Sequence, residues 1–371
     1  MSSRTIGPAL LAFGDGTSHQ GCLRVEDGRI AATEDGPQYI DYELPFGSTV
    51  SPGLIDLHVN GIARYWFNRE PVETVRAVAL AAPKRGVTAF LPSIMTAPWE
   101  QMLYAADEVY RCVNRPPSGA RPLGVHFEGP FLNPKFGRVH PREYILEPTP
   151  ARIEALLKTW AGGRCRVTMA PEIDEAPGAA AELKRHGVTL AAGHTGADFA
   201  AGNAAIEQGY HLLTHAFNAM PPLAGRGSSI LHAFLLEPTV MCEVIADNIH
   251  VSPESIALLY RLKTINLVLT TDVMPLVEGL VDEGGVARTK EGVIAGSLLT
   301  PDRAVRNLMA ATGLPLAEAV TCGTWAPARA IGVADEIGSL KVGMRADLAV
   351  WDRHNRITHA FVAGELVYAD S

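Results

Sequence analysis

The feature that most constrains this chain is a regular alternation of short apolar runs and helical stretches. Eight runs between residues 54 and 271 are almost continuously apolar, which is typical of parallel strands buried on both faces. Helical patterns rich in Ala, Leu, Glu and Arg separate them, for example over 72–85, 151–160, 178–186 and 198–208. The predicted strands are 54–59, 87–92, 123–128, 166–170, 188–192, 211–215, 241–246 and 266–271. Eight such units predict an α/β fold, a (β/α)8 TIM-type barrel.

The two ends of the chain do not share this pattern. Residues 4–50 and 337–371 contain short strand-like runs that are separated by turn signals such as Gly14-Asp15-Gly16. Because neither end alone buries enough surface to be stable, we expect both to pair into one small β-domain. The predicted organisation is a β-domain part at 1–50, the barrel at 51–335 and a second β-domain part at 336–371.

Composition limits the partners and the compartment. Lys and Arg number 32 against 40 Asp and Glu, so the formal net charge is −8, which argues against nucleic-acid and anionic-membrane partners. No apolar run approaches the roughly 18 residues of a membrane-spanning helix, and no signal-like run comes after the N-terminus. The five cysteines are widely spaced without a Cys-x-x-Cys pair, which predicts single thiols in a reducing cytoplasm.

Ligand-type side chains fall where predicted strands end. In a TIM barrel, functional side chains come from the C-terminal ends of the strands and the loops after them. His194 and His215 lie one βα repeat apart, so we expect them on adjacent strands, with Glu128 pointing into the same mouth. Two histidines and a carboxylate are a donor set that catalytic zinc accepts, with one position open for water. The residues at such positions are His58, Glu128, His194, His215, Asp247 and Asp272.

Asp272 comes directly after the eighth predicted strand. An uncompensated carboxylate would be costly to bury there, whereas a carboxylate near a cation stays ionised and can accept a proton from bound water. A helix N-cap or a loop ion pair is the structural alternative for this residue. Taken singly, each histidine could likewise be a satisfied core or surface residue.

Longer motifs occur in one order along almost the whole chain. They are SPGLIDLHVNG (51–61), HFEGPFLNPKFGRVHP (126–141), VTMAPE (167–172), AAGHTGA (191–197), THAFNAMPPLAGR (214–226), VIADNIHVSPE (244–254), TTDVMP (270–275), AGSLLT (295–300), WAPARAIGV (325–333) and GSLKVGMRADLAVWD (338–352). Together they resemble the amidohydrolase superfamily and, within it, the N-acetylglucosamine-6-phosphate deacetylase family. HFEGPF with HAFNAM is highly specific to that group. The resemblance implies a TIM barrel with a small β-sandwich built from both termini.

The same resemblance implies a metal site and a proton-transfer group. Glu128, His194 and His215 would hold one divalent metal per subunit; zinc is expected, with Fe²⁺, Co²⁺ and Mn²⁺ as alternatives. Asp272 would act as general base and then as the acid that protonates the leaving amine. His250 would bind the substrate and help to polarise its acetyl carbonyl.

The resemblance also implies a set of substrate contacts. His140 would contact the sugar hydroxyls, and Asn218 with the backbone N–H of Ala219 would approach the phosphate. Arg226 would reach a phosphate in the neighbouring subunit's site, which predicts a homodimer or a homotetramer. The turn that lines the sugar pocket would be Ile294, Ala295 and Gly296. Without the resemblance, Arg226 could be a solvated loop residue, Asn218 a helix cap, His140 a surface residue and His250 a structural histidine.

The implied function is hydrolysis of N-acetylglucosamine-6-phosphate to glucosamine-6-phosphate and acetate, with metal-bound water as the nucleophile. The alternative is the same chemistry on N-acetylgalactosamine-6-phosphate or another N-acyl amine. A metal-free isomerase barrel and a catalytically silent scaffold are further classes. The first predicts activity without metal, and the second predicts a missing ligand or base, whereas none is missing.

The first predicted strand departs from a pattern common among amidohydrolases. Many of them end this strand with His-x-His and bind a second metal, whereas this chain has His58-Val59-Asn60. Asn60 is a poor zinc ligand, so we expect one metal, with His58 as at most a weak contributor. Residues 62–66 (IARYW) replace a glycine-rich turn, and we expect them to change the wall of the pocket.

Overall fold

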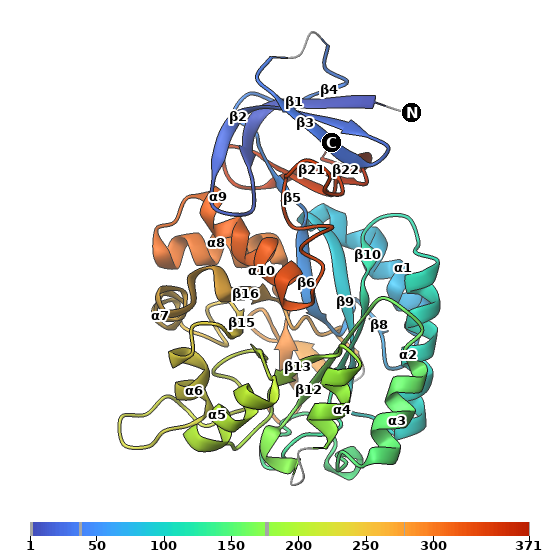
Figure 1. Cartoon of the computed structure of the whole chain (residues 1–371), viewed down its shortest axis with the longest axis vertical. Coiled ribbons are helices and arrows are strands. Elements are labelled where there is room, and N and C mark those ends of the chain that lie inside the picture. Colours follow the sequence, from blue (N-terminus) through green and yellow to red (C-terminus); the bar gives the residue numbers. More distant parts are fainter. Residues whose placement is uncertain (1–2, 37–38, 175–177, 278, 371) are drawn as a thin grey trace.

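A barrel of parallel strands forms the body of the molecule, as the sequence predicts. The computed structural model describes residues 3–36, 39–174, 178–277 and 279–370. Each of the eight predicted strands is present, and the TIM-type fold is confirmed (Figure 1). The barrel strands are β6 (Leu54–Val59), β9 (Val87–Met95), β11 (Gly124–Glu128), β12 (Arg164–Met169), β13 (Thr189–Ala192), β14 (Leu212–Leu213), β15 (Met241–Ile245) and β16 (Leu267–Thr270).

A buried carboxylate on the first strand joins the two ends of this barrel sheet. Asp56 of β6 accepts hydrogen bonds from the backbone N–H of Thr271 at 3.2 Å and from its hydroxyl at 2.5 Å, just beyond β16. Burial raises the pKa of Asp56 to about 6, against the opposing effect of these hydrogen bonds. The first and last barrel strands are thus held together through a side chain.

Helices surround the barrel and begin at residues suited to helix starts. Asp198 and Ser252 each accept a hydrogen bond from a backbone N–H three residues on, and four helices begin with proline. Among the described residues, no helix combines the length and the apolar character needed to span a membrane. The helices are α1 (Pro71–Ala81), α2 (Trp99–Asn114), α3 (Pro150–Thr159), α4 (Ala179–Arg185), α5 (Phe199–Gln208), α6 (Ile230–Leu236), α7 (Pro253–Lys263), α8 (Pro301–Thr312), α9 (Leu316–Ala319) and α10 (Trp325–Ala330), with 3-10 turns at 82–85, 142–144, 171–173, 264–266 and 320–323.

Strands from both termini form a second sheet beside the barrel (Figure 1). Its core gathers apolar side chains from both ends of the chain, including Leu11, Val50, Leu348 and Phe361. The predicted boundary at residue 50 falls inside β5, which pairs with both β1 and β20; the boundaries at 50 and 336 stay a prediction. In sheet order the strands are β22 (Glu365–Ala369), β21 (Ile357–Val362), β20 (Leu348–Trp351), β5 (Thr49–Pro52), β1 (Ser3–Ala12), β2 (Ser18–Glu26) and β3 (Arg29–Glu34), with β4 (Tyr42–Glu43) on β1.

Two small antiparallel elements lie outside the repeat. A three-stranded sheet of β17 (Leu280–Asp282), β18 (Val286–Thr289) and β19 (Ile294–Ser297) is inserted between β16 and α8. A short hairpin of β7 (Gly61–Ile62) and β8 (Tyr65–Trp66) comes after β6. Backbone bonds from Ser297 N to Asp272 O at 2.9 Å and from Met274 N to Ser297 O at 3.0 Å tie the inserted sheet to the end of β16.

A fully buried ion pair crosses the barrel interior. Arg166 of β12 donates to both carboxylate oxygens of Glu243 of β15, at 2.5 and 2.6 Å, and to the hydroxyl of Thr214 at 2.9 Å. His126 lies beside this pair, hydrogen-bonded at 2.8 Å to Ser93 and at 2.8 Å to Thr168. Below this polar layer, an apolar cluster closes the barrel with Leu57, Leu91, Leu212, Met241, Val268, Ile331 and Ile337.

We predict that Glu243→Ala destabilises the fold by about 3–5 kcal/mol, because it leaves the Arg166 guanidinium buried without its counter-charge. Chemical denaturation of wild type and variant measures the difference. The matched control is Lys158→Ala, which breaks an exposed ion pair with Glu154 and should leave the unfolding free energy almost unchanged. Equal effects of the two substitutions would contradict a buried, unhydrated pair.

Candidate metal centre and active site

The predicted ligand residues gather at the C-terminal end of the barrel. Glu128 is the last residue of β11, and His194, His215 and Asp272 lie two residues beyond β13, β14 and β16 respectively. The backbones of the last three have positive φ angles of 48°, 32° and 49°, which is unusual for residues with a Cβ atom. Such strained conformations persist where the surrounding structure fixes them, and they cluster at functional sites.

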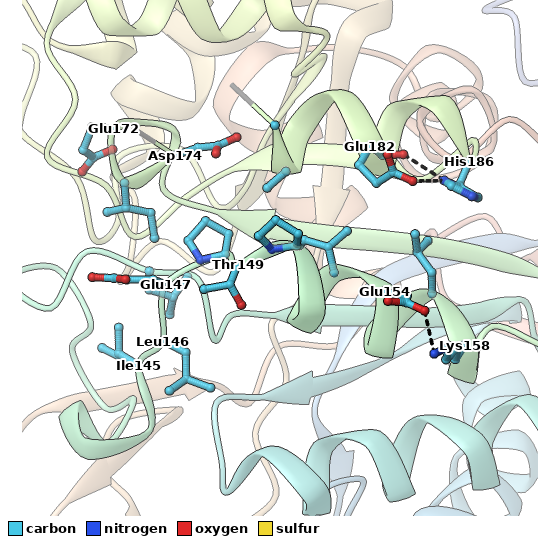
Figure 2. Close-up of a pocket in the computed structure, with 18 of the residues that line it drawn as sticks. Ile145, Leu146, Glu147, Thr149, Glu154, Lys158, Glu172, Asp174, Glu182 and His186 are labelled. Carbon is cyan, nitrogen blue, oxygen red and sulfur yellow. Dashed lines mark hydrogen bonds and ion pairs between the residues drawn. The ribbon is translucent and has the colours of Figure 1, made fainter. Parts of the chain in front are cut away.

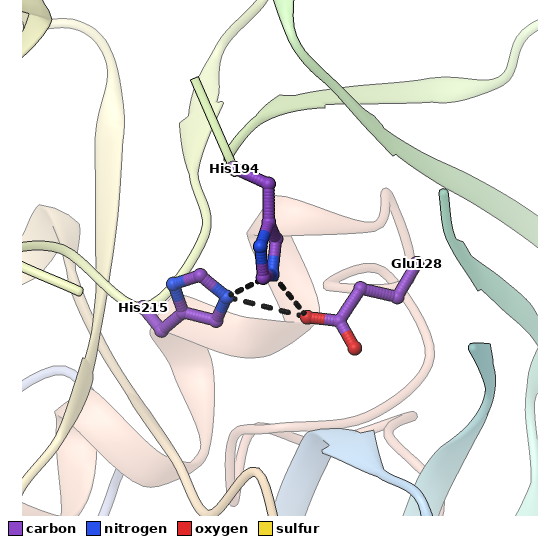
Figure 3. Close-up of side chains that lie close together, drawn as sticks. All are labelled: Glu128, His194 and His215. Carbon is purple, nitrogen blue, oxygen red and sulfur yellow. Dashed lines mark hydrogen bonds and ion pairs between the residues drawn. The ribbon is translucent and has the colours of Figure 1, made fainter. Parts of the chain in front are cut away.

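Three side chains converge on one point, as Figure 3 shows. The Nε2 atoms of His194 and His215 each lie 3.2 Å from Oε1 of Glu128, and 3.1 Å from each other. All three residues are buried. The structure therefore brings together the three predicted metal ligands from one strand end and two loops on this face.

The hydrogen bonds of His194 test whether these residues fit a metal. Its Nδ1 lies 2.9 Å from the carbonyl oxygen of Phe136, which can only accept, so Nδ1 carries the proton and Nε2 presents a lone pair in the neutral ring. Nδ1 of His215 is buried and has no hydrogen-bond partner among the described residues. Lone pairs of two imidazoles and a carboxylate that face one another at about 3 Å fit a divalent cation placed between them.

The charge state of Glu128 agrees with this arrangement. Burial disfavours its charged form, but His58 and the adjacent ring nitrogens of His194 and His215 outweigh burial and hold the pKa of Glu128 well below the usual range. The carboxylate is therefore ionised and available to a cation.

His58 and Asp272 form a second group of ligand-type atoms that shares Glu128. Nε2 of His58 lies 3.2 Å from Oε2 of Glu128 and 3.2 Å from Oδ1 of Asp272. Burial of the ring lowers its pKa, but the two carboxylates outweigh burial and raise the pKa of His58 to about 9. Asn60, which the sequence marks as a poor ligand, donates from Nδ2 to Oδ1 of Asp272 at 2.8 Å and so orients that carboxylate.

Asp272 has the electrostatic setting of a proton acceptor. Burial and the neighbouring carboxylate of Glu128 raise its pKa, although His58 opposes them. A raised carboxyl pKa moves the group toward the range in which it can both take up and return a proton near neutral pH.

A cavity of about 370 Å³ opens above these groups. It is lined by every predicted substrate residue except Arg226, which lies on an exposed loop. Two cations outside the set of predicted site residues, Arg138 and Arg288, also line it. The predicted residues on its wall are Glu128, His140, His194, His215, Asn218, Ala219, His250, Asp272, Ile294, Ala295 and Gly296.

Two histidines on the wall are held by specific partners. Nδ1 of His250 lies 2.6 Å from Oδ2 of Asp247, which leaves Nε2 as the free nitrogen. His140 is buried, with Nδ1 2.9 Å from the hydroxyl of Thr96 and Nε2 3.7 Å from Oε2 of Glu128. Burial, together with His194, lowers the pKa of His140 to about 3, so this ring is neutral.

The remaining wall comes from the inserted sheet rather than from the first hairpin. Residues 62–66 are absent from the cavity wall, in contrast to the expectation from the sequence; Trp66 packs behind the wall against Met95 and Met274. Gly296 of β19 allows a close approach, because a Cβ atom there would lie 2.9 Å from the carbonyl oxygen of Asp272. The glycine lets the inserted sheet pack directly on the residue that we assign as the base.

Glu172, in the VTMAPE motif, is a residue whose role the sequence did not reveal. Its carboxylate accepts hydrogen bonds from Asn133 Nδ2 at 2.8 Å, Gly196 N at 2.5 Å and the Thr195 hydroxyl at 2.5 Å. Asn133 N in turn donates to the carbonyl of His194 at 3.0 Å. Glu172 thus fixes the loop that carries a predicted metal ligand.

Glu172 also borders a larger groove of about 1150 Å³ between α3 and α4, shown in Figure 2. The groove is rich in carboxylates, but two of them have local partners: Glu154 lies 2.7 Å from Lys158, and Glu182 lies 3.3 Å from His186. Ligand-type atoms do not converge there as they do around Glu128, among the residues that the structure describes.

Comparison with protein families and curated proteins gives one consistent result. Residues 49–367 match the Amidohydrolase family model. N-acetylgalactosamine-6-phosphate deacetylase of Escherichia coli O157:H7 is 32% identical over 359 residues, covering 93% of this chain and 94% of the relative. N-acetylglucosamine-6-phosphate deacetylase of Vibrio furnissii is 31% identical over 357 residues, covering 92% of this chain and 89% of the relative.

Solved structures show the same similarity over both the barrel and the terminal sheet. N-acetylglucosamine-6-phosphate deacetylase of Pasteurella multocida matches with a TM-score of 0.92 at 27% identity, covering 100% of both chains. A mutant of the Mycobacterium smegmatis enzyme, in complex with N-acetyl-D-glucosamine-6-phosphate, matches with a TM-score of 0.91 at 30% identity, again over 100% of both chains.

We predict that Glu172→Ala weakens metal binding by about 10- to 100-fold, because the His194 loop loses the carboxylate that orders it. Competition with a chelator of known affinity measures the dissociation constant. Glu147→Ala is the matched control, since Glu147 is an exposed carboxylate on the same groove (Figure 2). An unchanged metal affinity in Glu172→Ala would show that the loop keeps its shape without this carboxylate.

Proposed function

This chain belongs to the amidohydrolase family, within its amino-sugar-6-phosphate deacetylases, and we propose that it hydrolyses the N-acetyl group of N-acetylglucosamine-6-phosphate. The products are glucosamine-6-phosphate and acetate. The observation that carries this proposal is the convergence of Glu128, His194 and His215 beside Asp272, at the base of a cavity of about 370 Å³. The names of the relatives supply the substrate class.

We assign one divalent metal per subunit to Glu128, His194 and His215. Zinc suits this set of two imidazoles and one carboxylate, and Fe²⁺, Co²⁺ and Mn²⁺ are alternatives that the same donors accept. When bound, the metal supplies Lewis acidity: it lowers the pKa of water and polarises the amide carbonyl. His58, 3.2 Å from Glu128, is at most a weak contributor, because its ring is held between two carboxylates.

Asp272 transfers the proton in this reaction. Its carboxylate accepts a proton from the attacking water as the new C–O bond forms at the acetyl carbon. It then gives this proton to the sugar nitrogen as the C–N bond breaks, because an amine leaves poorly without protonation. The hydrogen bond from Asn60 at 2.8 Å keeps the carboxylate in place during both transfers.

His250 and His140 position the substrate from the cavity wall. Asp247 holds Nδ1 of His250 at 2.6 Å, so that Nε2 can face the acetyl carbonyl. A proton on Nε2 would then help to polarise that carbonyl. His140, neutral and fixed by Thr96, offers its other nitrogen to a sugar hydroxyl. Ile294, Ala295 and Gly296 line the sugar pocket.

The phosphate group requires contacts at the rim of the cavity. We assign Asn218 and the backbone N–H of Ala219, whose φ of 52° belongs to a strained loop, to this group. Arg226 lies on an exposed loop, and we assign it to the phosphate of a neighbouring subunit in a homodimer or a homotetramer. We place the protein in the cytoplasm, which is supported by its five unpaired cysteines.

N-acetylgalactosamine-6-phosphate is the second candidate substrate. Curated relatives from Escherichia coli O157:H7 and Shewanella, 32% and 33% identical, carry that activity in their names. The two sugars differ at one carbon, so the same metal and proton chemistry applies to both. Another N-acyl amine is the broader alternative.

We predict that acetate is released from N-acetylglucosamine-6-phosphate, that chelation of the metal stops this release, and that added zinc restores it. The physical reason is that the three converging ligands need a cation to activate water. Acetate is measured for both sugar phosphates, and the ratio of kcat/KM identifies the preferred epimer. Full activity in the thoroughly chelated protein would contradict a metal-dependent reaction.

We predict that Asp272→Asn lowers kcat by at least about 100-fold, because the amide cannot accept and return the proton. Metal content, measured in the same samples, should remain at the wild-type level. Asp282→Asn, on the exposed face of the inserted sheet, is the matched control and should keep wild-type turnover. Wild-type kcat in Asp272→Asn would remove this residue from the proton-transfer role.

A further inference from the structure

We propose that Arg138 binds the substrate phosphate from within the same subunit and makes this pocket selective for phosphorylated amino sugars. The proposal rests on the proposed deacetylase function and names a specificity-determining residue for it. Arg138 lines the catalytic cavity, although its side chain remains exposed. A cation with those two properties lies at the rim, away from the buried groups that must face the acetamide.

The backbone around Arg138 forms a tight turn. His140 N donates to Gly137 O at 2.9 Å, and Arg138 comes after Gly137 with a φ of 54°. Glycine adopts this left-handed conformation freely, whereas a residue with a Cβ atom does so at a cost. A bulky, charged residue at such a position calls for a reason beyond the turn itself.

Side chains of the site form hydrogen bonds with the residues on either side of this turn. Before it, the carbonyl of Phe136 accepts a hydrogen bond from Nδ1 of His194, a predicted metal ligand, at 2.9 Å. After it, the ring of His140 is bonded to Thr96 at 2.9 Å. The backbone of Arg138 is therefore held between two residues that hydrogen-bond to other parts of the site, one of them through the predicted metal ligand His194.

The guanidinium of Arg138 is available to a ligand. Within the described part of the chain it makes no hydrogen bond, ion pair or stacking contact. Arg288, the other guanidinium on this wall, differs: it donates to Gly292 O at 2.9 Å and lies 3.6 Å from a carboxylate oxygen of Glu283. Arg138 is thus the cation on this wall whose donors remain unused.

Phosphate matches those unused donors. A phosphate dianion accepts two parallel N–H bonds from one guanidinium, which provides geometric selectivity as well as attraction. The cavity floor already carries two carboxylates, Glu128 and Asp272, so an anionic substrate needs a local cation at the rim. Arg226 of a neighbouring subunit would approach the same group from outside, whereas Arg138 supplies a cationic contact that, like Asn218 and the Ala219 N–H, does not depend on assembly.

The test compares phosphorylated and unphosphorylated substrates in the metal-loaded enzyme. In Arg138→Gly and Arg138→Gln, we expect KM for N-acetylglucosamine-6-phosphate to rise about 10- to 100-fold, as for loss of a charge-assisted hydrogen bond. KM for N-acetylglucosamine and kcat for both substrates should change less than about twofold. Arg142→Ala, an exposed arginine two residues after His140, is the matched control and should behave as wild type.

A second readout does not depend on turnover. Calorimetric titration with glucosamine-6-phosphate should show the same loss of affinity in both Arg138 variants, whereas glucosamine should bind wild type and variants alike. Arg138→Gly should also unfold at a temperature no lower than wild type, because glycine relieves the left-handed backbone.

The outcomes separate the two proposals. Unchanged KM and affinity for the phosphorylated sugars in both variants, or an equal loss for phosphorylated and unphosphorylated sugars, would overturn the role of Arg138. Absence of acetate release by the wild-type holoenzyme would instead overturn the proposed function, and the titrations would still decide whether Arg138 binds a sugar phosphate.

Discussion

The buried carboxylate of Glu128 is the group on which the arrangement of the catalytic face depends. Its Oε1 lies 3.2 Å from His194 and from His215, and its Oε2 lies 3.2 Å from His58 and 3.7 Å from His140. An isolated carboxylate at that depth would be expensive to desolvate, so these contacts are requirements of folding as much as of chemistry. The four histidines come from different strands and loops. The charge of Glu128 therefore holds several separate segments of the barrel in place relative to one another.

A second buried charge layer lies beneath this one. The Arg166–Glu243 pair crosses the barrel between β12 and β15 and is itself surrounded by hydroxyls and by His126. The burial of His126 and the adjacent guanidinium of Arg166 hold the pKa of His126 well below its usual value, so that ring stays neutral between the two layers. The edge of the His126 ring meets His58, with ring centroids 4.7 Å apart. The Arg166–Glu243 pair, the hydroxyls around it and His126 thus form a polar layer between the apolar cluster at one end of the barrel and the catalytic residues at the other. His58 packs on this layer through its contact with His126.

The βα periodicity of the sequence was enough to predict the strands and the residues at their ends. The contacts that depend on loop conformation could not be predicted. Strand positions and the set of Glu128, His194 and His215 could be predicted from βα spacing, because parallel strands end at one face. The hydrogen bond from Asn60 to Asp272 could not, since the sequence showed only that Asn60 is a poor ligand. Glu172 lies in a recognisable motif, yet its link to the His194 loop depends on a turn that no local pattern specifies. Arg138 was missed for the same reason: its left-handed φ becomes visible only once the loop between two fixed histidines has a shape.

The strained backbone conformations of the site residues and the apolar cluster that closes the barrel lie at opposite ends of the barrel. The residues with Cβ atoms and positive φ at the mouth are Ala63, Arg138, His194, His215, Phe217, Ala219, Asn248 and Asp272. Each such conformation costs on the order of 1 kcal/mol or more, and each must be imposed by its surroundings. Backbone bonds between loops impose several of them, including Thr195 N to Ala219 O at 3.2 Å and Ser297 N to Asp272 O at 2.9 Å. At the opposite end, the apolar cluster and the terminal sheet bury large side chains. Positive φ angles occur there too, at Asp27, Thr264, Asn355 and Ala363, but these residues lie in turns or at a helix end and are not predicted ligands. That asymmetry is the physical reason why the mouth can hold functional groups in fixed, unfavourable conformations: the free energy that maintains them comes from packing elsewhere in the same barrel.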